Sequence, residues 1–140
     1  MPSKKHRLRV VIDTSALVST LWGGIYLQII HLWKSGHLQL IVSADIVEEY
    51  LRVLAKLGVQ SIRLEGWAKW FRHPSKVTVA RPGTRFQVCR DANDNMFLDA
   101  AIAGKARFII VRDPDLTDMG SFRGIKIVTP QQFMEIYESR

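Results

Sequence analysis

Two aspartates follow predicted buried strands, at the positions where an α/β protein builds its binding sites. Asp13 comes directly after the apolar residues 8–12, and Asp113 follows the apolar residues 108–111. In open α/β sheets, ligands bind in the crevice outside the carboxyl ends of the strands. We therefore expect both carboxylates to face one crevice.

Two further acids, Glu49 and Asp94, are candidates for the same crevice. Glu49 lies six residues after Ser43, the predicted N-cap of a helix, and Asp94 lies at the start of another predicted helix. Carboxylates brought close together repel one another, and they either raise their pKa values or bind a hard cation. Oxygen ligands favour Mg²⁺ or Mn²⁺, so the four acids predict a metal site suited to phosphodiester hydrolysis.

Each of the four acids also has a purely structural interpretation. Asp13 and Asp94 are helix-capping residue types, Asp113 precedes Pro114 in a predicted turn, and Glu49 could occupy a solvated helix face. These alternatives require tests that separate activity from stability.

The composition limits the class of protein. The 140 residues carry 20 Lys+Arg against 13 Asp+Glu, a formal net charge of +7, and 47% are hydrophobic, which predicts a single domain over residues 1–140 with a buried core. One cysteine, Cys89, excludes an internal disulfide framework and a zinc site built on several thiolates. No apolar run approaches the ~18 residues of a membrane span. We expect a cytoplasmic protein with no membrane partner.

The positive charge is concentrated in two segments. Residues 1–12 hold four cations and no acid, and residues 61–90 hold seven cations and one acid. Such zones suit a protein that attracts a polyanion, although a solubilising surface gives the same count. We expect residues 1–7 to form a basic arm, a candidate disordered tail that binds RNA. The candidate nucleic-acid-binding cations are Lys4, Lys5, Arg7, Arg81, Arg85 and Arg112.

The elements that must position these residues alternate between strand and helix. Hydrophobic patterning predicts strands over 8–12, 38–42, 77–80, 108–111 and 125–128, and helices over 16–21, 25–34, 44–57, 62–71, 93–103 and 130–139. This alternation predicts an α/β layer fold with a mainly parallel sheet.

The aromatic residues allow two interpretations. Trp67, Trp70 and Phe71 are spaced i, i+3 and i+4 with cations between them, as expected for base stacking or for a helix edge that packs into the core. We favour packing. Trp22 and Trp33 are expected to close the core or a dimer contact.

Five stretches, in order along the chain, resemble the PIN-domain family. The last is similar to the C-terminus of the toxin–antitoxin (VapC-like) branch, and the likeness extends from about residue 7 to residue 137. Each motif is weak alone, but five motifs in the expected order make a specific pattern. The stretches are residues 11–19, 42–50, 91–95, 109–116 and 127–133.

This resemblance implies a three-layer α/β/α sandwich with a central, mainly parallel sheet. It also implies a Mg²⁺- or Mn²⁺-dependent ribonuclease that cleaves single-stranded RNA with a metal-activated water, leaving a 3′-hydroxyl and a 5′-phosphate. Further implications are the role of a toxin, a cognate antitoxin partner and a homodimer.

Carried over position by position, the acidic quartet of the family falls on four residues here. Asp13 and Asp94 would hold the main metal, and the other two acids would complete it or a second site. The threonine or serine after the first acid would hydrogen-bond a carboxylate or the metal's water. The implied catalytic and metal-binding residues are Asp13, Glu49, Asp94 and Asp113, with Thr14, Ser15 and Asp115 as auxiliaries.

Departures from the family pattern define the alternative. Val111 and Arg112 stand where the family usually has Thr or Ser followed by Gly, which motivates an inactive or weakly active PIN fold that binds RNA or protein. The presence of all four acids argues against it. A haloacid-dehalogenase-type phosphatase would need an acid at Ser15, and a receiver domain would need a strand that ends in Lys; neither pattern occurs.

Overall fold

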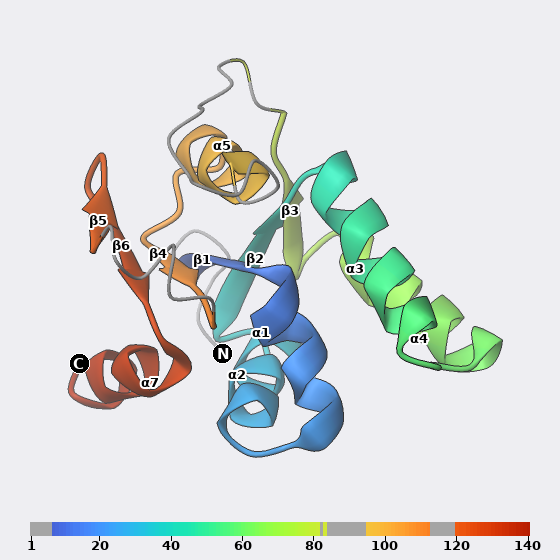
Figure 1. Ribbon diagram of the computed structural model, residues 1–140. Coiled ribbons are helices and arrows are strands. Elements are labelled where there is room, and N and C mark those ends of the chain that lie inside the picture. The colour runs from blue at the N-terminus through green and yellow to red at the C-terminus, as the bar shows by residue number, and fades with distance from the viewer. Residues whose placement is uncertain (1–6, 82, 84–94, 113–119) are drawn as a thin grey trace.

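A six-stranded sheet forms the centre of the computed structural model, which describes residues 7–81, 83, 95–112 and 120–140 (Figure 1). The strand order is β3-β2-β1-β4-β6-β5. The strands are β1 (Leu8–Ile12), β2 (Leu38–Val42), β3 (Val77–Val79), β4 (Phe108–Ile110), β5 (Ser121–Phe122) and β6 (Ile125–Val128). The helical segments are α1 (Thr14–Val18), η2 (Ser19–Trp22), α2 (Ile25–Lys34), α3 (Ala44–Lys56), α4 (Ser61–Phe71), α5 (Asn95–Ala103) and α7 (Pro130–Glu138).

The sheet is parallel except at one edge. β1 pairs in parallel with β2 and β4, β2 with β3, and β4 with β6, while β5 is antiparallel to β6. Parallel strands end together, so the sheet has one carboxyl edge, where β1, β2, β3, β4 and β6 end, and one amino edge, where they begin. Because Asp13 follows β1 and Arg112 follows β4, both lie at the carboxyl edge.

Helices cover both faces of the sheet and make a three-layer α/β/α sandwich. α5 packs over β1, β2 and β4 on one face, and α2 and α7 lie on the other face against β2, β4 and β6 (Figure 1). α3 contacts α1 and α5, and α4 packs against α3. Because both faces are covered, the central strands are apolar without alternation, and all five residues of β2 are buried.

Most of the predicted elements are confirmed. β1, β2, β6 and α2 have the predicted bounds. The first helix instead begins at Thr14, because Asp13 accepts a hydrogen bond from the Ala16 amide and caps it, and it tightens into a 3₁₀ turn at Ser19. β5 was not predicted, because two residues of an antiparallel edge pair give no periodic signal. The predicted turn at residue 82 and the helix start at residues 93–94 lie outside the described residues.

Gly104 lets α5 close onto the sheet. A Cβ at this position would lie 2.4 Å from Cγ2 of Ile41 in β2 and 3.1 Å from the carbonyl oxygen of Ala100. Any side chain there would force the helix and the strand apart. The predicted end of this helix at Gly104 is therefore confirmed, and close approach supplies the physical reason.

The α4 aromatics pack, as favoured from the sequence. Phe71 is buried, its ring stacks on Trp33 of α2 at 6.1 Å and on Trp67 at 5.6 Å, and it lies 5.1 Å from the ring of Tyr50 in α3. Trp33 is buried, so it closes the core as expected. Trp22 does not close the core, because it is 69% exposed, and the dimer contact expected as the alternative stays a prediction.

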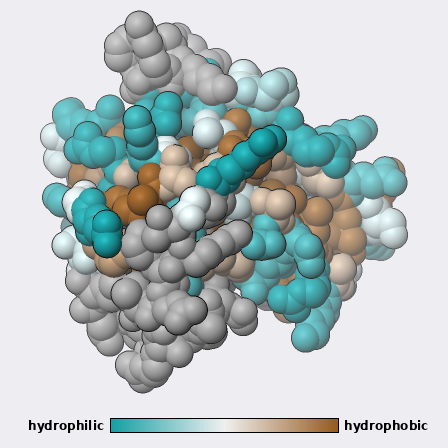
Figure 2. All heavy atoms as spheres, turned by 90° about the horizontal axis from the view of Figure 1, so that it is seen from above, coloured by the Kyte–Doolittle hydropathy of each residue, from teal (hydrophilic) through white to brown (hydrophobic). Residues whose placement is uncertain are grey.

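The side of the molecule that carries α5 shows hydrophobic atoms among hydrophilic side chains. In Figure 2, which views this side, hydrophobic atoms show at the left, at the centre and at the right, where α3 and α4 lie. Leu57 and Ile62, at the junction of α3 and α4, are exposed.

The described helices are short relative to a membrane span. In the described part of the chain, no single helix is both long and apolar enough, and the α1–η2 and α2 pair that qualifies by length and composition is bent by 104°.

Candidate active site

Asp13 is a buried carboxylate at the point where β1 gives way to α1. Its side chain is 3% exposed, and Oδ1 accepts a hydrogen bond of 2.7 Å from the Ala16 amide. Oδ2 accepts a longer bond of 3.4 Å from the Arg112 amide, and the Asp13 amide donates to the carbonyl of Ile110 at 3.0 Å. Asp13 is thus both a helix cap and the residue at which the ends of β1 and β4 meet.

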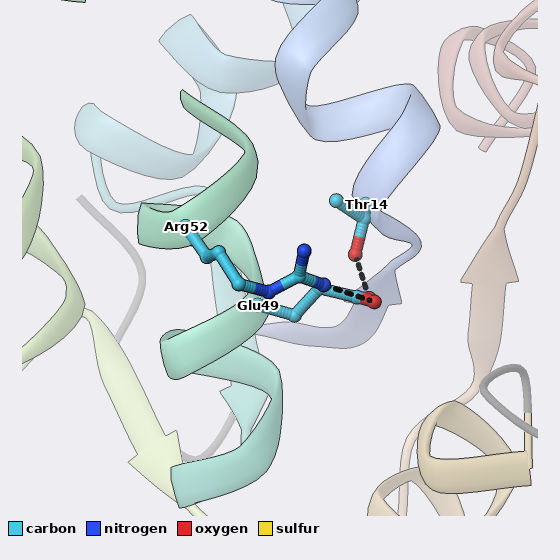
Figure 3. Close-up of polar contacts among 3 residues, drawn as sticks. All are labelled: Thr14, Glu49 and Arg52. Atoms are coloured by element: carbon cyan, nitrogen blue, oxygen red, sulfur yellow. Dashed lines mark hydrogen bonds and ion pairs between the residues drawn. The ribbon is translucent and has the colours of Figure 1, made fainter. Parts of the chain in front are cut away.

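Glu49 is brought to the same place from α3. Ser43 caps this helix by accepting a bond from the Ile46 amide, as predicted, and Glu49 follows between one and two turns later. The hydroxyl of Thr14 donates to Oε2 of Glu49 at 2.5 Å, and Arg52 approaches Oε1 at 3.3 Å (Figure 3). Because Thr14 adjoins Asp13, this bond fixes the Glu49 carboxylate beside the end of β1.

Tyr50 shows that the two carboxylates share one environment. Its ring is buried and its hydroxyl donates to the carbonyl oxygen of Ile12, the residue before Asp13. Burial raises the pKa of the Tyr50 hydroxyl well above its ordinary value, and the negative charges of Asp13 and Glu49 raise it further. The sequence pattern placed Tyr50 only on the apolar stripe of its helix and did not reveal the role of its hydroxyl.

Arg112 lies next to Asp13 with its side chain along α1. Its guanidinium Nη1 donates to the hydroxyl of Ser19 at 3.3 Å, and Ser19 in turn donates to the carbonyl of Ser15 at 2.7 Å. Ser15, a predicted auxiliary residue, is exposed. Arg112 therefore replaces the family's small residue with a cation held over the first helix.

Two buried polar residues on α5 were not predicted. Asn95, the first residue of the helix, and Asp99 are both buried, and their i, i+4 spacing places them on one helix face. α5 packs over β1 and β4, the strands that lead to Asp13 and Arg112. The available signal was an acid inside the apolar stretch of residues 96–103, since isolated charges in buried helices are rare.

The remaining predicted site residues divide by position. Asp94, Asp113 and Asp115, with Lys4, Lys5 and Arg85, lie outside the described residues. Arg81 is exposed two residues beyond β3, on the side of the carboxyl edge. Arg7 precedes β1 at the amino edge, where its guanidinium donates to Gln39 at 3.2 Å and to the carbonyl of Ser75. Strand β1 therefore separates Arg7 from Asp13.

The site meets part of the requirement for a divalent cation. Asp13, Glu49 and the Thr14 hydroxyl offer oxygen atoms, the ligand type that Mg²⁺ and Mn²⁺ prefer. Across the described ranges, no three His, Cys, Asp or Glu side chains form a group that could hold a metal ion. The chemistry of the two described acids therefore fits such an ion, and the two further predicted ligands lie in the ranges that are not described.

A separate groove of about 350 Å³ runs between the η2–α2 segment and α4. Its walls include Leu27, Trp67 and Trp70, and two cations, Lys34 and Arg63, line it. Lys34 lies 5.0 Å from the rings of both tryptophans, and burial lowers its pKa. None of the described residues that line this groove is acidic, and Asp13 and Glu49 lie elsewhere, so the groove is separate from the predicted carboxylate chemistry.

Comparison with known proteins agrees with this architecture. Residues 9–115 match the PIN domain family, a range that includes all four predicted acids. A protein of Methanocaldococcus jannaschii, Uncharacterized protein MJ1680, is 30% identical over 148 residues, which cover 96% of this chain and 95% of the relative. PIN domains are generally nucleases and typically use divalent metal ions. With its parallel sheet, its acids at the carboxyl edge and this match, the chain belongs to the PIN domain family.

Proposed function

We propose that this protein is a metal-dependent endoribonuclease that cleaves single-stranded RNA. The observation that carries the proposal is the convergence of Asp13 and Glu49, which reach the end of β1 from different elements and are joined through Thr14. Asp94 and Asp113 would complete the ligand set with Asp115 as an auxiliary. Like charges gathered at one point are costly without a cation to offset them.

The residues have distinct roles in this proposal. Mg²⁺ or Mn²⁺, when bound, supplies the positive charge that activates water and offsets charge on the phosphate. Asp13 is oriented by the amides of Ala16 and Arg112, and Glu49 by the Thr14 hydroxyl. Such pre-set orientation lowers the cost of assembling the ligands.

Cleavage of a labelled single-stranded RNA tests this proposal. The purified protein is incubated with Mg²⁺, Mn²⁺ or EDTA, alongside Asp13→Asn and Asp94→Asn. We expect cleavage with metal, none in EDTA, and loss in both variants. Products should carry 5′-phosphates, which ligation to a 3′-hydroxyl acceptor detects.

A matched pair of substitutions separates a ligand from a charge on the same helix. Glu49→Gln removes the carboxylate that Thr14 holds, and Glu48→Gln removes its exposed neighbour. We expect cleavage to fall only in the first. Equal cleavage in the two variants would remove Glu49 from the proposed ligand set.

Arg112 favours a second candidate, binding without cleavage. Its amide contacts Asp13 and its side chain lies over Ser19, so a cation occupies the neighbourhood of the proposed metal. RNA retained on the protein but left uncut under every metal condition would support this candidate. Arg112→Gly is then the variant to test for recovered cleavage.

The role of a toxin is the narrower form of the proposal, and its support is the resemblance of the closing segment. It predicts that expression of the chain arrests growth and that Asp13→Asn does not. It also predicts that a cognate antitoxin protein relieves the arrest, and that the toxin is a homodimer. Growth that is equal for the chain and the variant at matched protein levels would contradict it.

A further inference from the structure

One side of the first helix carries a row of residues that begins beside Asp13, with an exposed residue at each end and the buried Ser19 between them. Ser15, Ser19 and Trp22 are spaced i, i+4 and i+7 along α1 and the 3₁₀ turn η2, and the bond from Ser19 to the Ser15 carbonyl shows that they stack along the axis. Helical rise places Trp22 about 12 Å from Ser15. The row therefore leads outward from the proposed active site.

Trp22 stands out within this row by its exposure. It is 69% exposed, whereas the other described tryptophans are partly or fully buried among their neighbours. Gly23 and Gly24 follow with φ values of 79° and 69°, so the chain turns away directly after the ring. An indole so placed has a ring face available for stacking.

Charge favours a polyanion as the molecule that covers this row. The guanidinium of Arg112 is held over Ser19, between the carboxylates and Trp22. From residue 14 to residue 44 the sequence contains no Asp or Glu. A phosphate strand that leaves Asp13 along α1 would thus meet a cation and then an aromatic ring, the combination that single-stranded nucleic acid sites use.

We propose that Trp22 stacks on an unpaired base of the substrate strand and that Arg112 binds a phosphate between that base and the cleavage site. This inference rests on the proposed function, because it takes single-stranded RNA as the substrate. It assigns to Trp22 and Arg112 a binding site a few nucleotides away from the scissile bond, which selects single strands because a paired base cannot stack on the ring.

RNA affinity measured without turnover tests the inference. In an Asp13→Asn background with EDTA, a fluorescein-labelled unstructured RNA is titrated by anisotropy, with and without Trp22→Ala, Trp22→Phe and Arg112→Ala. Loss of one stacked base predicts affinity about 5- to 100-fold weaker for Trp22→Ala. Trp22→Phe should retain most of the affinity, and Arg112→Ala should reduce the salt dependence by about one phosphate contact.

Leu57→Ala is the matched control, since it also truncates an exposed apolar side chain but at the far end of α3 from Ser43. Its RNA affinity should be unchanged. A second readout is the quenching of tryptophan fluorescence by unlabelled RNA, which should shrink when Trp22 is replaced by Phe.

The outcomes distinguish this inference from the proposed function. If wild-type protein cleaves RNA but Trp22→Ala binds it as tightly as the parent, the inference fails alone. If nothing is cleaved but affinity depends on Trp22, the inference stands and the nuclease proposal fails. If RNA is neither bound in this assay nor cleaved by wild-type protein with metal, both fail. A change from dimer to monomer on Trp22→Ala, measured by light scattering, would make Trp22 part of a self-interface and overturn the inference.

Discussion

The two edges of the parallel sheet differ in charge and in what the charge does. Helices end near the amino edge, and their last carbonyls face cations there. Helices begin at the carboxyl edge, where the positive ends of their dipoles face acids. At the amino edge, Arg7 donates to the carbonyl of Ser75, Arg9 to that of Gly104 at 3.0 Å, and Lys76 to that of Lys34 at 2.7 Å.

The charges at the carboxyl edge also converge, which those at the amino edge do not. Arg7, Arg9 and Lys76 each donate to a different carbonyl, so these contacts are dispersed and stabilise the fold. Asp13 and Glu49 instead meet at one point, because the hydroxyl of Thr14, the residue after Asp13, holds the Glu49 carboxylate, and both acids raise the pKa of the neighbouring Tyr50. Gathering like charges does not stabilise a fold by itself, which is why we assign function to this edge.

The largest effect is expected from Asp13, which both caps α1 and supplies a proposed ligand. Asp13→Asn keeps an oxygen that can accept from the Ala16 amide but loses the charge, so cleavage should fall by about a thousandfold or more while unfolding free energy changes little. Asp13→Ala should abolish cleavage and also lower stability by about 0.5–2 kcal/mol. Urea unfolding and RNA cleavage measure the two effects. Full activity in Asp13→Asn would contradict the assignment of the active site to the carboxyl edge.

A large effect on stability alone is expected at the amino edge. Arg7→Ala removes the bonds to Gln39 and Ser75 and should lower the unfolding free energy by about 1–3 kcal/mol. Arg107→Ala, an exposed cation before β4, is the control and should cost less than about 0.5 kcal/mol. Arg7 was also predicted to bind nucleic acid. Weaker RNA binding by a stably folded Arg7→Ala protein would contradict a purely structural role for Arg7.

A pH-dependent effect is expected from Tyr50. Unfolded tyrosine loses its proton near pH 10, whereas the raised pKa of Tyr50 keeps its proton on in the folded state. The native state therefore binds more protons above about pH 10, and stability falls as pH rises through that range, by at most about 1.4 kcal/mol per pH unit. Below pH 10 this contribution is fully present.

Tyr50→Phe isolates that contribution. It retains the ring against Phe71 but loses the bond to Ile12, which should cost about 1 kcal/mol at neutral pH. The alkaline fall in stability should be shallower than in wild type, measured by urea unfolding between pH 8 and 11, the range that brackets the ordinary tyrosine pKa of about 10. Tyr137→Phe serves as the control. An unchanged alkaline slope in Tyr50→Phe would contradict the raised pKa of the buried Tyr50 hydroxyl.

The smallest effect is expected from Arg52. Its ion pair with Glu49 is at the surface, with the Arg52 side chain 57% exposed, so Arg52→Ala should change stability by less than about 0.5 kcal/mol. Cleavage should also be nearly unchanged, because the Thr14 hydroxyl still holds Glu49. Lys56→Ala, one turn later on α3, is the control. A large loss of cleavage specific to Arg52→Ala would show that Arg52, on the surface of α3, contributes to cleavage.

Local patterning predicted most of the strands and helices. The strands are marked by apolar runs and most helices by caps and glycines, signals that act within a few residues. Ser43 and Thr129 are two such caps, and their side chains accept hydrogen bonds from the amides of Ile46 and Gln132. β5 was missed because an antiparallel edge pair depends on its neighbour strand rather than on its own residues. The split of the first helix at Ser19 likewise had no local signal.

The site was only partly accessible from the sequence. Asp13 and Glu49 were predicted, and the structure brings them together through Thr14. The use of the Tyr50 hydroxyl, the burial of Asp99 and the exposure of Trp22 were not predicted. Hydropathy patterns report that a side chain is apolar enough to be buried, and they do not specify its hydrogen-bond partner or the part of the molecule that covers it.

The sequence by itself determined the order of strands and helices and the acids at strand ends, because periodicity and capping act over short distances along the chain. Only the tertiary structure decided which charges meet. Parallel pairing of β1 with β2 and β4 places residues 13, 49 and 112 at one edge and residue 7 at the other, although residues 7 and 13 are near neighbours in sequence. Electrostatic energy depends on distance in space, so the role of each charge followed from pairing and packing.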